Sequence, residues 1–391
     1  MKTTSVKLIS TLALAGFSVS ALANDIRTAL TNGDVDLNLR YRLEQVDEDG
    51  RDKDALASTL KTRLTYTSQS FNNTQLLLEF DDVHVVGEQR YLDGEDRPMI
   101  ADPEGTELNQ AALIYKGVTN TTITAGKQRI VLGNQRYVGG VAWRQHEQTY
   151  NAVSFLNESL SNTKLFYSYI DQVNSFIHTA DDINHDSHLL YLENTSLDQH
   201  KITAYAFLLD NRDNHNQSSQ TLGARFEGGV AGLGYALEYA QQSEYSRPDG
   251  NDLDADYEFL EVSYKIGDVK VLAALEVLGS DDGNAAFQTP LATKHKFNGW
   301  ADKFLVTPND GLEDTYVGAI ATISGTTVKL FYHEFEANEG NNEYGEEIDL
   351  AVARKFGDFN CLLKLADYKA DEDDATRTDT QKIWLQVATT F

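Results

Sequence analysis

The chain has 391 residues and is strongly acidic, because 60 aspartates and glutamates outweigh 33 lysines and arginines to give a formal net charge of -27. Such a surface disfavours nucleic acid as a partner, since binding the phosphate backbone needs a basic footprint. The single cysteine, Cys361, can form no disulfide within the chain. The molecule must therefore be held together by hydrogen bonds and packing.

Residues 1–23 have the pattern of a secretory signal peptide. Two lysines precede an apolar run that begins at Leu8, and the small residues at 21–23 suit cleavage. The run is too short for a helix to span a bilayer, which takes roughly 18 apolar residues or more, and no later stretch is as apolar over that length. We expect cleavage after Ala23 and a single domain over residues 24–391.

The first predicted strand covers residues 35–47, where apolar and polar side chains alternate without a break. Val35, Leu37 and Leu39 fall on one face, and Arg40 and Arg42 fall on the other. A period of two indicates a strand with one apolar and one polar face. The same alternation predicts further strands at 58–70, 74–86, 107–118, 121–133, 149–159, 163–176, 187–196, 200–211, 219–229, 231–244, 255–266, 268–279, 314–324, 326–337, 346–356, 358–369 and 379–391.

The connectors between these strands alternate in length. Short ones such as GVTNT, GGVAG and SGT follow the even-numbered strands, and long acidic ones such as residues 88–106 follow the odd-numbered strands. This alternation is typical of barrels in the bacterial outer membrane. Because a strand facing lipid cannot leave its backbone unpaired, the sheet must close. The predicted fold class is all-β: an 18-stranded antiparallel up-and-down transmembrane β-barrel in the outer membrane.

The alternative is a secreted soluble all-β protein, a propeller or a solenoid. Those folds carry a repeated signature for each blade or rung, and the sequence shows none. Eighteen strands leave room for an aqueous lumen. The last residue, Phe391, follows an alternating strand and resembles the signal read by the outer-membrane assembly machinery. Outer-membrane lipid and lipopolysaccharide are the other expected partners.

With the lumen face assigned by the same alternation, basic side chains are predicted on the lumen wall or within reach of it. They are Arg40, Arg42, Lys61, Arg63, Lys127, Arg129 and Arg225. The first four lie on neighbouring strands and should form one basic strip. Acidic side chains on the same strands can pair with part of this charge, so two interpretations stay open: structural salt bridges across the wall, or contacts with a passing anion.

Two stretches outside the regular pattern concentrate further cations. In GKQRIVLGNQRYVGGVAWRQHEQTY, residues 126–150, Arg136 and Arg144 lie in a glycine-containing connector where few groups can pair with them, which favours a functional role. The longest connector contains TKHKFNGWADKFL, in which cations and rings suit a carboxylated sugar; alternatively the loop only folds over the mouth. Its candidate residues are Lys294, Lys296, Trp300 and Lys303.

Enzyme motifs are missing from the sequence. A GxSxG elbow, an HExxH helix, a phosphate-binding loop and a CxxC pair are all absent. We therefore expect no enzymatic activity, no cofactor and no metal site.

The stretch at 126–150 resembles the alginate-export family of outer-membrane β-barrels. The matching elements are Lys127-Gln128-Arg129, Gln135-Arg136-Tyr137 and Trp143-Arg144-Gln145, and a second block, HKFNGWADKFL at 295–305, is followed by Thr307-Pro308 and Gly311-Leu312. The resemblance implies an 18-stranded monomeric barrel whose arginine-rich lumen conducts an anionic uronate polymer, with Arg129, Arg136 and Arg144 as lumen contacts.

The function we predict is a porin-like channel for passive passage of an anionic solute, a sugar acid or an oligosaccharide. In such a channel, fixed cations lower the barrier for anions while weak binding lets the solute leave. The alternative is a non-conducting surface barrel that binds extracellular polysaccharide or a partner.

Overall fold

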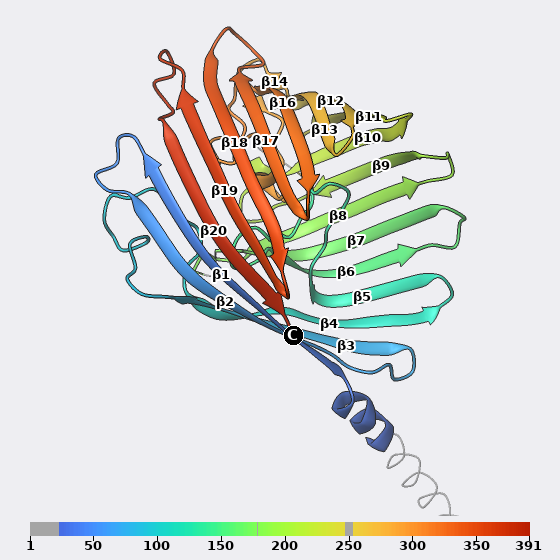
Figure 1. Ribbon diagram of the computed structural model, residues 1–391. Coiled ribbons are helices and arrows are strands. Elements are labelled where there is room, and N and C mark those ends of the chain that lie inside the picture. Colours follow the sequence, from blue (N-terminus) through green and yellow to red (C-terminus); the bar gives the residue numbers. More distant parts are fainter. Residues whose placement is uncertain (1–22, 178, 247–252) are drawn as a thin grey trace, which may run out of the picture.

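The computed structural model describes residues 23–177, 179–246 and 253–391, and its strands form a closed antiparallel barrel (Figure 1). The sheet has 18 strands, each paired with its neighbours in the chain. β1 (Asp34–Glu48) closes the ring by pairing with β20 (Thr380–Thr390). The predicted fold class is thus confirmed. The expected signal peptide lies outside the described residues, apart from Ala23, which begins a helical stretch at 23–31.

The remaining barrel strands follow the predicted order. They are β2 (Ala55–Thr67), β3 (Thr74–Val85), β4 (Gly105–Val118), β5 (Thr121–Gln128), β6 (Thr149–Asn157), β7 (Thr163–Asn174), β8 (Ile183–Asn194), β9 (His200–Leu209), β10 (Ser219–Val230), β11 (Leu233–Ser243), β12 (Asp254–Ile266), β13 (Val269–Leu278), β16 (Leu312–Ile323), β17 (Thr326–Glu336), β18 (Glu343–Phe356) and β19 (Phe359–Ala370). Within the described residues, two connectors contain short elements. The 3-10 turn η1 (His215–Gln217) lies between β9 and β10, and the hairpin of β14 (Ser280–Asp281) and β15 (Ala285–Ala286) and the 3-10 turn η2 (Lys294–Lys296) lie between β13 and β16.

The alternation along each strand separates a polar interior from an apolar exterior. On β1, Arg42 and Glu44 are buried, while Tyr41, directly before Arg42, is exposed. Apolar side chains at outward positions of many strands are exposed, as a lipid-facing surface requires. Examples on five strands are Leu64, Leu113, Leu237, Leu260 and Leu385. Within the described residues, no helix is long and apolar enough to cross a membrane.

The connectors are short at one end of the barrel and long at the other (Figure 1). The turn between β16 and β17 has only two residues, Ser324 and Gly325, whose φ angles are 50° and 77°. Two positive φ angles match the strand twist of a tight hairpin. The short turns are therefore those that the sequence predicted.

One predicted strand is too long. The segment 121–133 was expected to continue along the wall, but β5 ends at Gln128. The backbone amide of Arg129 donates to the side-chain Oε1 of Gln110 at 3.0 Å instead of to a neighbouring strand. The chain therefore leaves the sheet and turns into the lumen at this point.

Two long connectors, residues 129–148 and 279–311, meet inside the barrel. Val138 and Leu291 form a parallel bridge, and the amide of Gly139 donates to the carbonyl of Leu291 at 2.9 Å. The amide of Thr293 donates to the carbonyl of Gln135 at 3.1 Å. A buried apolar cluster joins both loops to the walls, including Ile130, Phe287 and Phe304. The lumen is thus crossed by a paired structure made from two distant segments.

Candidate lumen site

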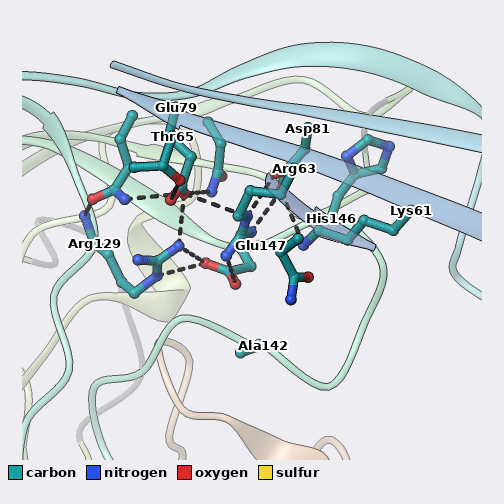
Figure 2. A network of polar contacts seen from close by, with 12 residues as sticks. Lys61, Arg63, Thr65, Glu79, Asp81, Arg129, Ala142, His146 and Glu147 are labelled. Atoms are coloured by element: carbon teal, nitrogen blue, oxygen red, sulfur yellow. Dashed lines mark hydrogen bonds and ion pairs between the residues drawn. The ribbon is translucent and has the colours of Figure 1, made fainter. Parts of the chain in front are cut away.

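An ion network ties the first inward loop to the wall formed by β2 and β3 (Figure 2). Arg63 donates to both oxygens of Asp81, at 2.7 and 2.6 Å, and its Nη1 lies 2.8 Å from Glu147. Arg129 contacts the same Glu147 at 2.6 Å through Nε and reaches Glu79 at 2.8 Å. Charge-assisted bonds of this kind are stronger than neutral ones. Arg129 is therefore a structural bridge from loop to wall.

The network controls the ionisation of Glu147, which lies in the inward loop. Burial alone raises the pKa of this carboxyl, but the nearby charges of Arg63, Lys61 and Arg129 outweigh burial and lower the pKa to about 2. Nζ of Lys61 also lies 3.0 Å from Asp81. Lys61 is on β2, where it is the register partner of Arg40 on β1. The predicted basic strip exists, and carboxylates neutralise part of it.

Arg136 is not the unpaired cation that the sequence suggested. Its Nε lies 2.7 Å from Glu276 on β13, and its Nη2 donates to Asn298 of the second loop at 3.0 Å. The side chain is 2% exposed, and its guanidinium stacks over Phe297 at 4.8 Å. Its partners lie more than a hundred residues away in the chain, so the local sequence could not reveal them.

Arg144 is paired as well, which corrects the second expectation for this connector. Its Nη1 lies 3.2 Å from Glu44 on β1, and its Nη2 donates to Asp302 of the second loop at 3.1 Å. Arg40 on β1 binds the same connector through the carbonyl of Ala142, at 2.9 Å, and Oε1 of Gln145, at 2.8 Å. Arg136 and Arg144 thus hold the inward loops to two separate parts of the wall, β13 and β1.

Lys127 is the one predicted lumen residue that strand pairing places on the outer face. It pairs with Ala111 and Asn151, two positions from the outward-facing Leu113 and Val153. The next residue, Gln128, is the buried inward one. The prediction failed because the alternation of β5 was read in the wrong register, and a one-residue shift moves every side chain to the other face.

Arg225 faces the lumen as predicted and is paired there. Its Nε donates to Glu227 at 2.7 Å and its Nη1 donates to Glu238 at 2.8 Å. In the long loop, Lys303 contacts Glu48 on β1 at 2.8 Å. These two cations therefore also have carboxylate partners.

Lys294 and Lys296 lie in η2, next to the cavity described below. Lys296 is exposed and donates to the carbonyl of Asn134 in the first loop at 2.9 Å. Burial, followed by the charge of Arg136, lowers the pKa of Lys294 to about 8. The second loop therefore brings two lysines into the lumen, and the charge of one of them is weakened near neutral pH.

A cluster around Lys364 on β19 contains all three tryptophans of the chain, and no pattern in the sequence predicted it. The ammonium of Lys364 lies 3.8 Å from the ring centre of Trp300, 4.3 Å from that of Trp143 and 5.3 Å from that of Trp384. A cation over aromatic faces is attracted by their negative charge density. Each of these residues comes from a different element, so only the folded barrel unites them.

His295 connects this cluster to the loop carboxylate Asp302. Its Nε2 lies 2.6 Å from Nζ of Lys364, and its Nδ1 lies 2.6 Å from Oδ1 of Asp302. Burial holds the pKa of His295 well below its ordinary value, so the ring is neutral and accepts from the ammonium. Lys382 on β20 adds a bond to Asp302 at 2.8 Å. The loop is thereby fixed to β19 and β20.

A cavity of about 690 Å³ lies between residues 293–300 of the long loop and the barrel wall. Its aromatic lining includes Trp143, Phe297, Trp300, Tyr316 and Phe331. Two carboxylates, Glu261 and Glu276, face this space. Six cationic side chains line it, namely Arg40, Arg42, Lys270, Lys296, Lys329 and Lys364. In a chain that is strongly acidic as a whole, this interior is locally basic.

One group of side chains has the spacing of a metal site among the described residues. Ligand atoms of Asp81, Glu107 and His146 lie within 4.8 Å of one another. Asp81, however, already meets Arg63 and Lys61, at 2.6 and 3.0 Å. Two cations beside one ligand repel a third, so the donor set is poorly suited to a metal ion.

Comparisons with known proteins match the structure but not the sequence. No protein-family model matches the chain, and no curated protein matches it. Pseudomonas aeruginosa OccK9 (OpdG) superposes with a TM-score of 0.71 at 15% identity, covering 93% of this chain and 100% of that one. Acinetobacter baumannii OccAB4 gives a TM-score of 0.72 at 13% identity, covering 93% and 99%. The fold is that of an outer-membrane porin.

A third porin structure, Pseudomonas aeruginosa OpdK with vanillate, has a TM-score of 0.67 at 14% identity and covers 92% of this chain and 98% of that one. At identities this low, the superposition shows a shared fold only. The lumen chemistry of this chain must be inferred from its own residues. The outer-membrane location that the strand pattern predicted agrees with the porin fold. The comparisons do not reproduce the resemblance to the alginate-export family.

Proposed function

We propose that the barrel is a passive outer-membrane channel for small anionic solutes, with the basic cavity under the inward loops as its selective region. The observation that carries this proposal is the concentration of six cations in one cavity of an acidic chain. Fixed cations in a narrow, weakly screened space lower the free energy of a passing anion. The paired arginines of the first loop serve mainly to build the constriction.

We place the solute among sugar acids and short oligosaccharides rather than long uronate polymers. The two loops are bonded to each other across the lumen through Val138 and Leu291, which narrows the path. Aromatic rings beside the cations, such as Trp300 and Phe331, can stack on the apolar face of a sugar or on an aromatic ring. The porin solved with vanillate, a small carboxylate, supports this size class. The resemblance to the alginate-export family supports the carboxylated chemistry.

A second candidate is favoured by the packing of the same loops. Their apolar cluster with the walls, which includes Val138 and Leu291, resembles a plug more than a mobile lid. In that case the barrel would bind an extracellular polysaccharide or a partner without conducting. Under both candidates we propose lipid, lipopolysaccharide and the assembly machinery as partners, and neither nucleic acid nor an enzymatic reaction.

Planar-bilayer recording of the purified barrel separates these candidates, because a plugged barrel gives no conductance steps. For an open barrel, the reversal potential in a salt gradient should show a preference for anions. Replacing the exposed cavity lysines in K296Q/K329Q should reduce that preference, most strongly at low salt, where screening is weakest. K53Q, in an exposed outer loop, is the matched control. An unchanged reversal potential in the double variant would contradict the proposed role of the cavity.

A further inference from the structure

Two acidic residues, Glu347 and Asp349, form a buried pair at successive inward positions of β18, and both are 0% exposed. Within the described part of the chain, Oε2 of Glu347 and both carboxyl oxygens of Asp349 have no hydrogen-bond partner. Two buried carboxyl groups on neighbouring inward positions of one strand cannot both be ionised without strong repulsion, so the acid pair shares a proton.

Glu347 also holds the long inward loop. Its Oε1 accepts hydrogen bonds from the amides of Trp300 and Ala301, the latter at 2.8 Å. The loop approaches so closely that a Cβ on Gly299 would lie 2.3 Å from Oε2 of Glu347, and Gly299 has a φ of +77°. The acid pair is thus the place where the loop backbone rests on β18, next to the ring that covers Lys364.

The charged and titratable groups around the acid pair hold their shorter contacts with other residues, and His333 is the cation that also approaches Asp349. On β17, His333 holds Asp314 of β16 at 2.8 Å through Nδ1, and its Nε2 lies 3.9 Å from Asp349. On β19, Lys364 contacts His295 at 2.6 Å. Tyr368, the register partner of Glu347, donates to a backbone carbonyl. Glu276 on β13 pairs with Arg136 at 2.7 Å.

We propose that the acid pair is a proton-operated latch that fixes residues 279–311 across the lumen. With the shared proton in place, Asp349 donates to Glu347, whose Oε1 keeps the two loop amides. At alkaline pH the proton leaves, and two adjacent negative charges push apart in a space that water does not reach. Glu347 then moves from its position, and the loop loses its support on β18. The effect of the latch on permeation rests on the proposed channel function; the latch itself does not.

Hydrogen–deuterium exchange of the loop peptide containing Trp300 and Ala301 tests the latch directly. In the purified barrel, exchange should accelerate by about tenfold or more beyond the intrinsic rate between about pH 7 and about pH 12. D349N donates to Glu347 as the protonated acid does, so its exchange should follow the intrinsic rate alone. E347Q, whose amide can accept from the loop and donate to Asp349, should behave in the same way. The outward-facing Glu346, which contacts Tyr332, supplies the control E346Q, which should respond to pH as the native chain does.

Equal pH responses in the native chain, D349N and E347Q would overturn the latch. Two isosteric variants are used so that the test can still be made if one of them does not fold. Bilayer recording adds a separate readout: alkaline pH should increase current fluctuations in the native barrel but not in D349N. If the barrel gives no conductance at any pH while exchange still responds, the latch stands and the channel function fails. If conductance is present and exchange does not respond, the latch fails alone.

Discussion

At the scale of single residues, guanidinium groups in the lumen connect segments that are distant in the chain through ion pairs and hydrogen bonds. Arg136 joins the first loop to β13, and Arg144 joins it to β1 and to the second loop. A planar group with several donors in fixed directions suits this role better than a lysine ammonium. The desolvation of each charge is offset only while its partners stay in place, so removing one partner is costly.

Breaking the pair of Arg136 and Glu276 should therefore destabilise the barrel strongly. R136Q leaves a buried carboxylate unpaired, and we expect a loss of about 3–5 kcal/mol in the free energy of unfolding, measured by urea titration in detergent. The double variant R136Q/E276Q also removes the unpaired charge of Glu276, so it should recover part of the lost stability. The exposed pair of Lys53 and Glu95 is the control, since K53Q should cost less than about 1 kcal/mol. A double variant no more stable than R136Q would contradict the ion-pair explanation.

The ionisation of Glu147 gives a pH-dependent prediction at the same scale. Its folded pKa, about 2, lies below the ordinary value of 4.5, so folding favours the charged form. Its contribution is present above the ordinary value and is lost as pH falls toward 2. The stability difference between the native chain and E147Q should be constant at neutral pH and shrink below about pH 4.5. A difference that does not change over this range would exclude the charge network as its source.

At the scale of elements, the sequence predicted the strands of the barrel wall but not the paired loops that cross the lumen. Alternation of apolar and polar residues along a strand is a local signal, so the strands of the wall could be predicted with small errors in their ends. The inward loops have no such period, and the partners of Arg136 and Arg144 lie on segments far away in the chain. Nothing in the local sequence distinguishes Lys364 from other polar residues of a strand, because the three tryptophans around it are brought there only by the fold.

The junction of the two inward loops can be tested at Thr293. Its hydroxyl donates to Oε1 of Gln135 at 2.8 Å and accepts from the amide of Val141 at 3.1 Å. T293V keeps the shape of the side chain but leaves Oε1 of Gln135 and the amide of Val141 without this hydrogen-bond partner. The free energy of unfolding should fall by about 1–3 kcal/mol, and the junction should become more mobile. Faster cleavage within residues 129–148 by protease, with an intact barrel, is the expected result. T327V, at a partly exposed wall position, is the control, and equal cleavage in both variants would show that the junction does not depend on this hydroxyl.

At the scale of the whole molecule, closure explains how an acidic chain without disulfides holds together. Every wall strand has two neighbours, because β1 pairs with β20. Closure removes the unpaired edges that lipid would not tolerate. Strand number and chain order followed from the alternation and from the lengths of the connectors, because both properties repeat along the chain.

The two ends of the barrel give a topological prediction. The long connectors should face the outside of the cell and the short turns the periplasm. An epitope tag after Asp281, in the connector between β13 and β16, should bind antibody on intact cells. A tag between Ser324 and Gly325, in a two-residue turn, should bind only after the outer membrane is permeabilised. Labelling in the opposite pattern would reverse the orientation of the whole barrel.

The gathering of all three tryptophans around Lys364 makes the intrinsic fluorescence of this protein a local signal. Trp143 and Trp384 have ring centres 5.7 Å apart, and Trp300 covers the same ammonium. Light emitted by any indole of the chain therefore originates at one place, where the long loop rests on β19 and β20. A solute that enters the cavity, or a loop that leaves it, would change the colour or yield of that emission without any added label.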